Sequence, residues 1–248
     1  MKGTLSRVVA RLRSLGFEDA DARILADHFL DADRRGRESH GVARIDWLET
    51  LPDLDPAALP ARPVAEDAYE LWEGRGALGY LTLAANVETQ LGAPPEHARV
   101  VVARDCFPTG SLGYWVRRLA EGGLVGLLTG TSPARLSHPD GGEPLAGTNP
   151  LAIAIPSSDE RPLVADVSMG RVTHGDVLLG TAPPQDLVPF GGEQAHKAFA
   201  LALGLQLLVD ALAGREGYGA VLVVARPKAD PVPGLRARAG GLHLPGDR

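Results

Sequence analysis

RVVVARDCFPTGSLGYWVRRLAEGGLVGLLTGT, residues 99–131, contains the change of periodicity that decides the fold class. Its first segment, RVVVAR, is a short β-branched apolar run of the kind that forms a buried strand. SLGYWVRRLAEGG has helical spacing and ends at Gly122-Gly123, and the following LVGLLTGT is again typical of a strand. A strand, a helix and a second strand in this order predict an α/β fold.

The same alternation continues on both sides of this stretch. AYELWE precedes a helical YLTLAANVETQLG, and LAIAIP, PLVADV and GAVLVVA have the composition of further strands. Ala195 to Ala213 has the pattern of a long helix that stops at Gly214. We therefore expect an α/β domain over residues 68–226. Residues 227–248 lack periodicity and are predicted to form an irregular tail.

The first fifty residues predict a small helical domain. Apolar residues at three- and four-residue spacing indicate one helix around Leu5 to Leu15, a second after Glu18-Asp19 and a third from Gly41 to Thr50. Four prolines follow within residues 51–67. Because so many prolines prevent a helix from continuing, this segment is predicted to be a linker.

Composition and charge exclude several classes of protein. The 248 residues carry 25 basic and 31 acidic side chains, a net charge of −6, which argues against a dedicated nucleic-acid binder. The single cysteine, Cys106, excludes an internal disulfide and a cysteine-based zinc site, and no histidine spacing predicts another metal site. Neither a signal peptide nor a membrane span is apparent. These features predict a cytoplasmic protein without nucleic-acid or membrane partners.

A glycine pattern after the first predicted strand of the α/β domain has two interpretations. Gly74, Gly76 and Gly79 match the spacing of a dinucleotide-binding loop, with Asp105 at the end of the next strand as a possible ribose ligand. The alternative is a glycine turn that only connects the strand to the helix. In a chain with 30 glycines the match carries little weight, and we favour the turn.

The segment RESHGVAR, residues 37–44, is more informative. His40 and Arg44 are four residues apart, so a helix that starts near Gly41 would place them close to one face. An imidazole can transfer a proton near neutral pH, and a guanidinium can hold a carboxylate through two hydrogen bonds. Ser39 would cap that helix. The alternative is an ordinary surface pair, because His and Arg often share a helix.

Three further segments carry polar residues with a structural and a functional interpretation. Thr148 and Asn149, in the turn GTNP, can either shape that turn or contact a ligand. Asp166 ends a strand, where ligand sites of α/β sheets gather, although turn aspartates are also common there. Lys197 heads the long helix, where a solvated charge is the usual interpretation. Cys106 has no basic cluster beside it and is predicted to pack in the core.

Taken in order, these segments resemble the type-2 malate/L-lactate dehydrogenase family, which also contains ureidoglycolate, sulfolactate and diketogulonate enzymes and cyclic imino acid reductases. The matching stretches cover most of the chain. They are SHGVARI (39–45), GALGYLTLAANVE (76–88), GSLGYWVRRLAEGGLVGLLTGTSP (110–133), GGEPLAGTNPLAIAIP (141–156), VADVS (164–168), FGGEQAHKAFALALGLQLLVDALAG (190–214) and the terminal LPGDR.

The resemblance implies a mixed-sheet α/β domain that is not a standard Rossmann fold, a small N-terminal helical domain and a homodimer. It implies hydride transfer between NAD or NADP and C2 of a small 2-oxo, 2-hydroxy or cyclic imino acid. His40 would be the general acid/base with Ser39 beside it, and Arg44 would hold the substrate carboxylate. The other positions implied are Thr131, Ser132, Asp166, Val167, Ser168 and Lys197 for the dinucleotide, and Thr148 and Asn149 for the substrate.

The chain departs from the family pattern at several positions near the expected site. Pro108 stands where the family has a second histidine, and Leu48 replaces a frequent tyrosine. Gly175-Asp176 replaces a glycine–lysine pair, and the segment between Leu179 and Phe190 is short. These departures motivate an alternative hypothesis, in which Ser39, His40 and Arg44 perform cofactor-independent isomerisation, cyclisation or elimination in a biosynthetic pathway.

Overall fold

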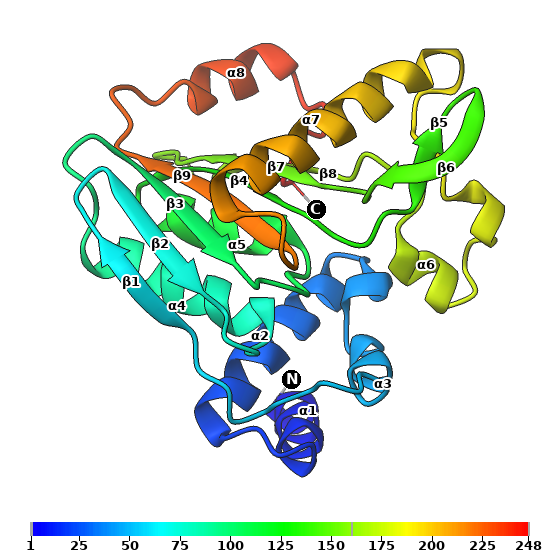
Figure 1. Ribbon diagram of the computed structural model, residues 1–248. Coiled ribbons are helices and arrows are strands. Elements are labelled where there is room, and N and C mark those ends of the chain that lie inside the picture. Colours follow the sequence, from blue (N-terminus) through cyan, green and yellow to red (C-terminus); the bar gives the residue numbers. More distant parts are fainter. Residues whose placement is uncertain (1, 160, 248) are drawn as a thin grey trace.

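The computed structural model describes residues 2–159 and 161–247, and a seven-stranded mixed sheet forms its centre (Figure 1). The strand order is β1-β2-β3-β9-β4-β7-β8, in which β2 and β3 are parallel and the other neighbours antiparallel. This sheet confirms the predicted mixed α/β class. Its strands are β1 (Ala61–Ala65), β2 (Tyr69–Glu73), β3 (Ala98–Arg104), β4 (Val125–Gly130), β7 (Leu151–Ile155), β8 (Leu163–Val167) and β9 (Gly219–Ala225); β5 (Leu136–His138) and β6 (Gly141–Ala146) pair separately.

Helices cover both faces of the sheet (Figure 1). α4 (Gly79–Gly92) and α5 (Leu112–Glu121) lie on one face, together with α1 (Lys2–Ser14) and α2 (Asp19–Arg34). α7 (Ala195–Ala213) packs on the other face, where Val209 and Ala213 contact β3 and β9. The short elements are α3 (Arg44–Leu48), α6 (His174–Leu178) and α8 (Val232–Ala239), with 3-10 turns η1 (Glu38–His40), η2 (Pro184–Asp186) and η3 (Gly192–Gln194).

The N-terminal helices share one hydrophobic core with the sheet. Leu12 and Phe29 belong to the same buried cluster as Leu83, Trp115 and Leu128, and all five are almost fully buried. Each such side chain contributes roughly 1.5–3 kcal/mol by leaving water. This burial anchors the helical segment to the α/β part.

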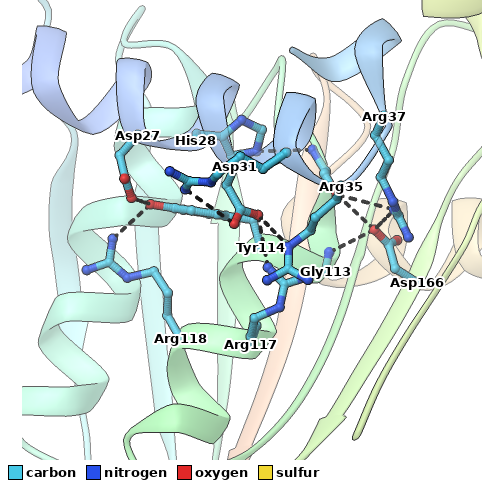
Figure 2. A network of polar contacts seen from close by, with 12 residues as sticks. Asp27, His28, Asp31, Arg35, Arg37, Gly113, Tyr114, Arg117, Arg118 and Asp166 are labelled. Atoms are coloured by element: carbon cyan, nitrogen blue, oxygen red, sulfur yellow. Dashed lines mark hydrogen bonds and ion pairs between the residues drawn. The ribbon is translucent and has the colours of Figure 1, made fainter. Parts of the chain in front are cut away.

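Polar contacts fix α2 against α5, as Figure 2 shows. The Tyr114 hydroxyl donates to Asp27 at 2.6 Å, and the Arg117 guanidinium donates to Asp31 at 3.0 Å. Arg35, just after α2, donates to the same Asp31 carboxylate at 3.0 Å. The end of α2 is therefore held in place, and with it the start of the RESHGVAR segment.

The proline-rich residues 51–67 contain a strand that we predicted as linker. β1 pairs with β2 at the edge of the sheet, with a register irregularity between Ala61 and Val64. Pro63, which lies in that irregularity, has no N–H to donate, and an edge strand with a bulge tolerates this loss. The linker prediction was therefore wrong for residues 61–65.

Two other predicted segments also differ from the structure. The predicted tail contains the helix α8. Its prolines and glycines are turn signals, so the sequence does not predict a helix there. Arg236 of this helix donates a hydrogen bond to the Arg161 carbonyl at 2.7 Å. The predicted helix over residues 41–50 is reduced to α3, because Gly41 has extended backbone angles. A Cβ at Gly41 would lie 1.6 Å from the Asp33 carboxylate, so this close approach requires glycine.

By length and composition alone, the segment Gly192–Ala213 is apolar enough to cross a membrane. This differs from the expectation that no segment of the chain would be apolar enough to span a membrane. The inner side of α7 packs on the sheet, but only 28% of the apolar window is buried, so most of this window lies outside the core.

Candidate active site

One edge of the sheet carries a cavity of about 200 Å³. β3, β4 and β8 end at this edge, and β7 and β9 begin there, because Arg104 pairs with Gly219, Gly130 with Ala220, and Leu151 with Val167. The loops that follow these strand ends surround the cavity, and η1, α3 and the start of α6 close it from the helical side. This placement brings sequence-distant polar residues together.

His40 and Arg44 both line the cavity, as predicted, but they do not share a helix. His40 ends η1, whereas Arg44 is the first residue of α3. The predicted common helix was wrong, since extended Gly41 separates the two elements. The turn between them, rather than helical spacing, brings the imidazole and the guanidinium to one cavity.

Ser39 orients the His40 ring instead of capping a helix. Its hydroxyl lies 3.2 Å from His40 Nδ1, and α3 has no side-chain cap. Ser39 also hydrogen-bonds Asp176, whose carboxylate caps α6 with Thr173. If the Ser39 hydroxyl donates to Asp176, its oxygen accepts from His40 Nδ1–H, which leaves Nε2 as the basic nitrogen.

The pKa of His40 is lowered to about 4, first by burial and then by the positive charge of Arg44. Asp166 opposes this shift, whereas Arg37 adds to it. His40 is therefore neutral at pH 7 and able to accept a proton. A bound anion beside Arg44 would raise this pKa, because it would cancel the nearest positive charge.

The Arg44 guanidinium lacks hydrogen-bond partners where it is buried. Its carbon lies 4.1 Å from the centre of the Trp47 ring, and Nε and Nη1 are buried without a hydrogen bond of good geometry within the described chain. The buried Tyr80 hydroxyl interacts with this guanidinium. Buried donors of a charged group are costly unless they are satisfied. Nε and Nη1 are closed off from solvent, so an anion would be bound by the part of the guanidinium that lines the cavity.

Asp166, predicted as a dinucleotide contact, lines the cavity and is already bound by protein groups. Its Oδ2 accepts hydrogen bonds from Arg37 at 2.5 Å, Ser111 Oγ at 2.9 Å and Gly113 N–H at 3.0 Å (Figure 2). The last donor is at the N-terminus of α5, where a carboxylate is stabilised. Asp166 thus connects β8 to α5 and to the segment before η1.

The other predicted residues divide into two groups. Ser132, Thr148 and Ser168 line the cavity, as does Thr131, whose hydroxyl accepts from Gly219 N–H at 2.9 Å and joins β4 to β9. Three lie elsewhere: Asn149 is buried and donates to the Ala202 carbonyl, Val167 is 45% exposed, and Lys197 lies on the exposed side of α7. The roles of all these residues toward ligands stay predictions.

Sequence reasoning missed several residues at the cavity. Arg37, Ser111, Arg135 and His174 line it, but none stands in a spacing that distinguishes it from other surface residues. His28 was not singled out either, because it lies within the second predicted helix without a distinguishing spacing. It is fully buried, and its Nε2 accepts from Ser111 N–H at 3.2 Å. Burial lowers the pKa of His28 to about 3, so it is a neutral acceptor.

The glycine pattern at residues 74–79 is filled by protein backbone, in agreement with the turn interpretation. Gly76 N–H donates to the Asp105 carboxylate at 2.7 Å, and a Cβ at Gly79 would lie 2.7 Å from the Pro108 carbonyl oxygen. The glycines thus permit the close approach of residues 105–108. Cys106 is buried, and burial raises the pKa of its thiol to about 12, which fits a packing role.

Two departures from the family pattern have different positions in the structure. Pro108 lines the cavity, and its side chain cannot transfer a proton. Leu48 is buried in the core. Among the described residues, no group of three or more His, Cys, Asp or Glu side chains is arranged to hold a metal ion.

Comparison with known proteins shows the family. A sequence model of the malate/L-lactate dehydrogenase family matches residues 3–182. A (2R)-3-sulfolactate dehydrogenase (NADP(+)) of Chromohalobacter salexigens is 32% identical over 174 residues, 69% of this chain and 52% of that protein. A malate dehydrogenase of Pyrococcus horikoshii is 30% identical over 236 residues, 88% of this chain and 64% of that protein. The chain belongs to the malate/L-lactate dehydrogenase family and spans about half to two thirds of these relatives' lengths.

Solved structures agree in fold. The Δ1-piperideine-2-carboxylate reductase of Pseudomonas syringae superimposes with a TM-score of 0.85 at 23% identity, covering 98% of this chain and 89% of that chain. A dehydrogenase of Sinorhizobium meliloti gives a TM-score of 0.82 at 23% identity, with coverages of 99% and 88%. The mixed-sheet architecture is therefore that of these proteins.

Proposed function

We propose that this protein is an NAD(P)-dependent oxidoreductase that transfers a hydride to or from C2 of a small 2-oxo or 2-hydroxy acid or a cyclic imino acid. The observation that carries the proposal is the partly buried Arg44 guanidinium, which no described carboxylate neutralises, in the same cavity as a neutral His40. Arg44 would bind the substrate carboxylate, and His40 would exchange the proton at the substrate oxygen or nitrogen. Family membership supports this assignment.

The proton step follows from the state of His40. With its pKa lowered to about 4, His40 accepts the hydroxyl proton of a 2-hydroxy acid at Nε2, while Ser39 and Asp176 hold the ring. In the reductive direction, His40 must first be protonated. A carboxylate bound to Arg44 favours that protonation, because it reduces the positive charge beside the ring. Substrate binding would thus prepare the acid.

The cavity suits the nicotinamide end of a cofactor. Ser132, Thr148 and Ser168 present neutral polar side chains at the strand ends, and an adjoining cavity of about 400 Å³ shares Arg37, His40 and Asp166 with the first. When bound, the nicotinamide would supply or accept the hydride. These hydroxyls would hold it, and the residues around Arg37 would line its path.

Calorimetric titration with NADH and NADPH tests the cofactor directly. We expect one of the two to bind in the micromolar range, about −8 kcal/mol, which also chooses between NAD and NADP. Lys197→Ala, a change on the exposed side of α7, then tests the dinucleotide contact that the resemblance implies. Absence of binding by folded wild-type protein would contradict the redox function and direct the search to cofactor-independent chemistry at His40.

We also propose a homodimer that pairs through the outer face of α7. This outer face has no charged residue over more than three turns, whereas the opposite side of the helix packs on the sheet. Its members are Ala200, Leu201, Gly204, Leu207, Leu208, Ala211 and Leu212. So long an apolar strip on a chain with net charge −6 indicates a contact surface.

A second copy of the chain fits this outer face. Antiparallel pairing about a two-fold axis near residue 206 would bring Leu201 against Leu212 of the partner subunit. The same centre brings Lys197 near Glu216 of the partner subunit, so the ends of the strip are complementary in charge. Light scattering is expected to give twice the 26.0 kDa chain mass, and Leu208→Glu to give one chain. A monomeric wild type, or wild-type binding to anionic lipid vesicles that Leu208→Glu abolishes, would contradict the dimer.

A further inference from the structure

The turn GTNP, residues 147–150, is fixed to α7 by the side chain of Asn149. The Asn149 amide is fully buried, and its Nδ2 donates two hydrogen bonds of 3.0 Å, one to the Ala202 carbonyl and one to Gln206 Oε1. Both acceptors belong to one turn of α7, the helix that packs on the sheet. Neither Asn149 nor Gln206 lines the cavity, whereas Thr148 of the same turn does. A helix outside the cavity therefore holds a segment of its wall.

The hydrogen bonds from Asn149 to α7 have a fixed direction. Gln206 Nε2 donates to Asp210 Oδ1 at 3.0 Å, and because an ionised carboxylate only accepts, the other end of the Gln206 amide, Oε1, faces Asn149. The Ala202 carbonyl likewise only accepts, so it requires Nδ2 rather than Oδ1 of Asn149. The donors therefore run from Asn149 through Gln206 to Asp210, and neither amide can reverse without losing a hydrogen bond.

The backbone around Thr148 is in close contact with other parts of the cavity wall. The Thr148 carbonyl accepts from the Met169 N–H at 2.8 Å, just after β8. At Gly147 an added Cβ would lie 2.4 Å from Ser132 Oγ, which lines the cavity, and 2.6 Å from Asn149 Oδ1. Asn149 Oδ1 is buried without a hydrogen-bond partner in the described chain, so the two bonds to α7 decide the orientation of this amide. Displacing the turn from α7 would thus move Thr148.

We propose that Asn149 and Gln206 are positioning residues, which hold Thr148 at the cavity wall from α7 and so set the affinity of the site for its acid substrate. Both bond only to protein groups, so Gln206 acts on a ligand only through the turn. The inference rests on the proposed function for the substrate, whereas the position of Thr148 can be measured without a ligand. The alternative is that the same bonds only stabilise the packing of α7 on the sheet.

The first test compares Gln206→Met with Gln194→Met in calorimetric titration of the protein with 2-hydroxybutanoate, a small 2-hydroxy acid. Gln206→Met removes the acceptor of one Asn149 bond, and we expect about threefold to tenfold weaker binding, which corresponds to the loss of one hydrogen bond. Gln194→Met makes the same change at an exposed position just before α7, so this matched control should bind like the wild type. Circular dichroism and light scattering verify that both variants are folded and keep the wild-type mass.

A second substitution, Thr148→Val, distinguishes positioning from general destabilisation. If Gln206 acts through Thr148, Gln206→Met should lower the affinity much less in the Thr148→Val protein than in the wild type. Equal losses in the two proteins would show that Gln206 acts by another route. Wild-type affinity in either single variant would show that the contact does not set binding. Each of these results overturns the proposal.

Hydrogen exchange at the Met169 amide reports the position of the turn without any ligand. This N–H donates to the Thr148 carbonyl, so its exchange should be several-fold faster in Gln206→Met and unchanged in Gln194→Met. Unchanged exchange in Gln206→Met overturns the proposal. If the wild type binds neither 2-hydroxybutanoate nor a dinucleotide and Gln206→Met still accelerates this exchange, the positioning of Thr148 stands and the proposed function fails.

Discussion

The arginines that line the cavity fall into two sets. In the first, Arg37 pairs with Asp166, which also accepts hydrogen bonds from Ser111 and Gly113, so the charges of the protein balance one another. In the second, Arg44 and Arg135 have no carboxylate partner among the described residues. The first set, which we call the paired side, holds β8, α5 and the segment before η1 together, whereas the second set, the unpaired side, leaves positive charge at the cavity.

This difference separates residues that stabilise the fold from residues that bind. Removing a member of a paired buried group leaves its partner unsatisfied and lowers stability. Removing an unpaired buried charge abolishes a binding contact and relieves a desolvation cost. Substitutions on the two sides should therefore change different measured quantities.

Replacing Arg44 should have the largest effect, and on binding alone. Arg44→Met is expected to lower the affinity for a 2-hydroxy acid by roughly a hundredfold or more, since loss of a buried charge-assisted contact costs about 2–5 kcal/mol. The free energy of unfolding should stay the same or rise, because two unsatisfied buried donors disappear. Calorimetry with 2-hydroxybutanoate and urea unfolding measure the two quantities. Unchanged affinity would show that Arg44 does not bind the carboxylate.

Replacing Asp166 should have the reverse effect. Asp166→Asn removes the charge that balances Arg37 and weakens the bonds from Ser111 and Gly113, so the free energy of unfolding should fall by about 2 kcal/mol. Arg37→Met should cost less, because half-exposed Arg37 leaves Asp166 with two remaining donors. Urea unfolding at pH 7 measures both. Equal stability of Asp166→Asn and the wild type would contradict a structural role for the pair.

The histidines near the cavity should make the protein sensitive to acid. The pKa of His28 is lowered to about 3 and that of His40 to about 4, mainly by burial, so the unfolded chain binds more protons below pH 6.5. The contribution of the two neutral histidines to the free energy of unfolding is therefore fully present above pH 6.5. The free energy of unfolding falls as pH decreases below that value, by up to about 1.4 kcal/mol per pH unit for each histidine. Urea unfolding between pH 7 and 5 should show a shallower slope for His28→Gln. An equal slope in that variant would show that His28 is not responsible.

The sequence was sufficient for the elements with clear periodicity. The strand at RVVVAR, α5 and the bounds of α7 agree with their predictions, because apolar periodicity and terminal glycines specify them locally. β1 and α8 were missed, since Pro63 and the glycines near residue 240 carry turn signals that tertiary contacts override. Local propensity fails where a sheet edge or a distant carbonyl provides the partner.

The site was predictable only where one segment carried it. His40 and Arg44 stand in RESHGVAR and could be proposed together, although the reason given, a common helix, was wrong. Arg135, just before β5, and His174, at the start of α6, are brought to this edge only by the sheet topology. His28 lies on the buried face of α2, and its bond to Ser111 depends on how α2 packs against α5, which the sequence does not show.

The smallest predicted effect tests how closely the paired side is packed. A Cβ at Gly113 would lie 2.8 Å from the Asp166 carboxylate, so Gly113→Ala should push that carboxylate from Ser111 and Arg37. We expect the free energy of unfolding to fall by about 1 kcal/mol. Overpacking typically costs about 1–3 kcal/mol, and the higher helix propensity of alanine over glycine offsets part of that cost. Gly92→Ala, in α4 with nothing within 4 Å of the added Cβ, is the matched control and should be neutral or slightly stabilising. If urea unfolding shows both alanines stabilising alike, Asp166 can move without cost, and the contrast between the two sides of the cavity is weaker than the paired geometry indicates.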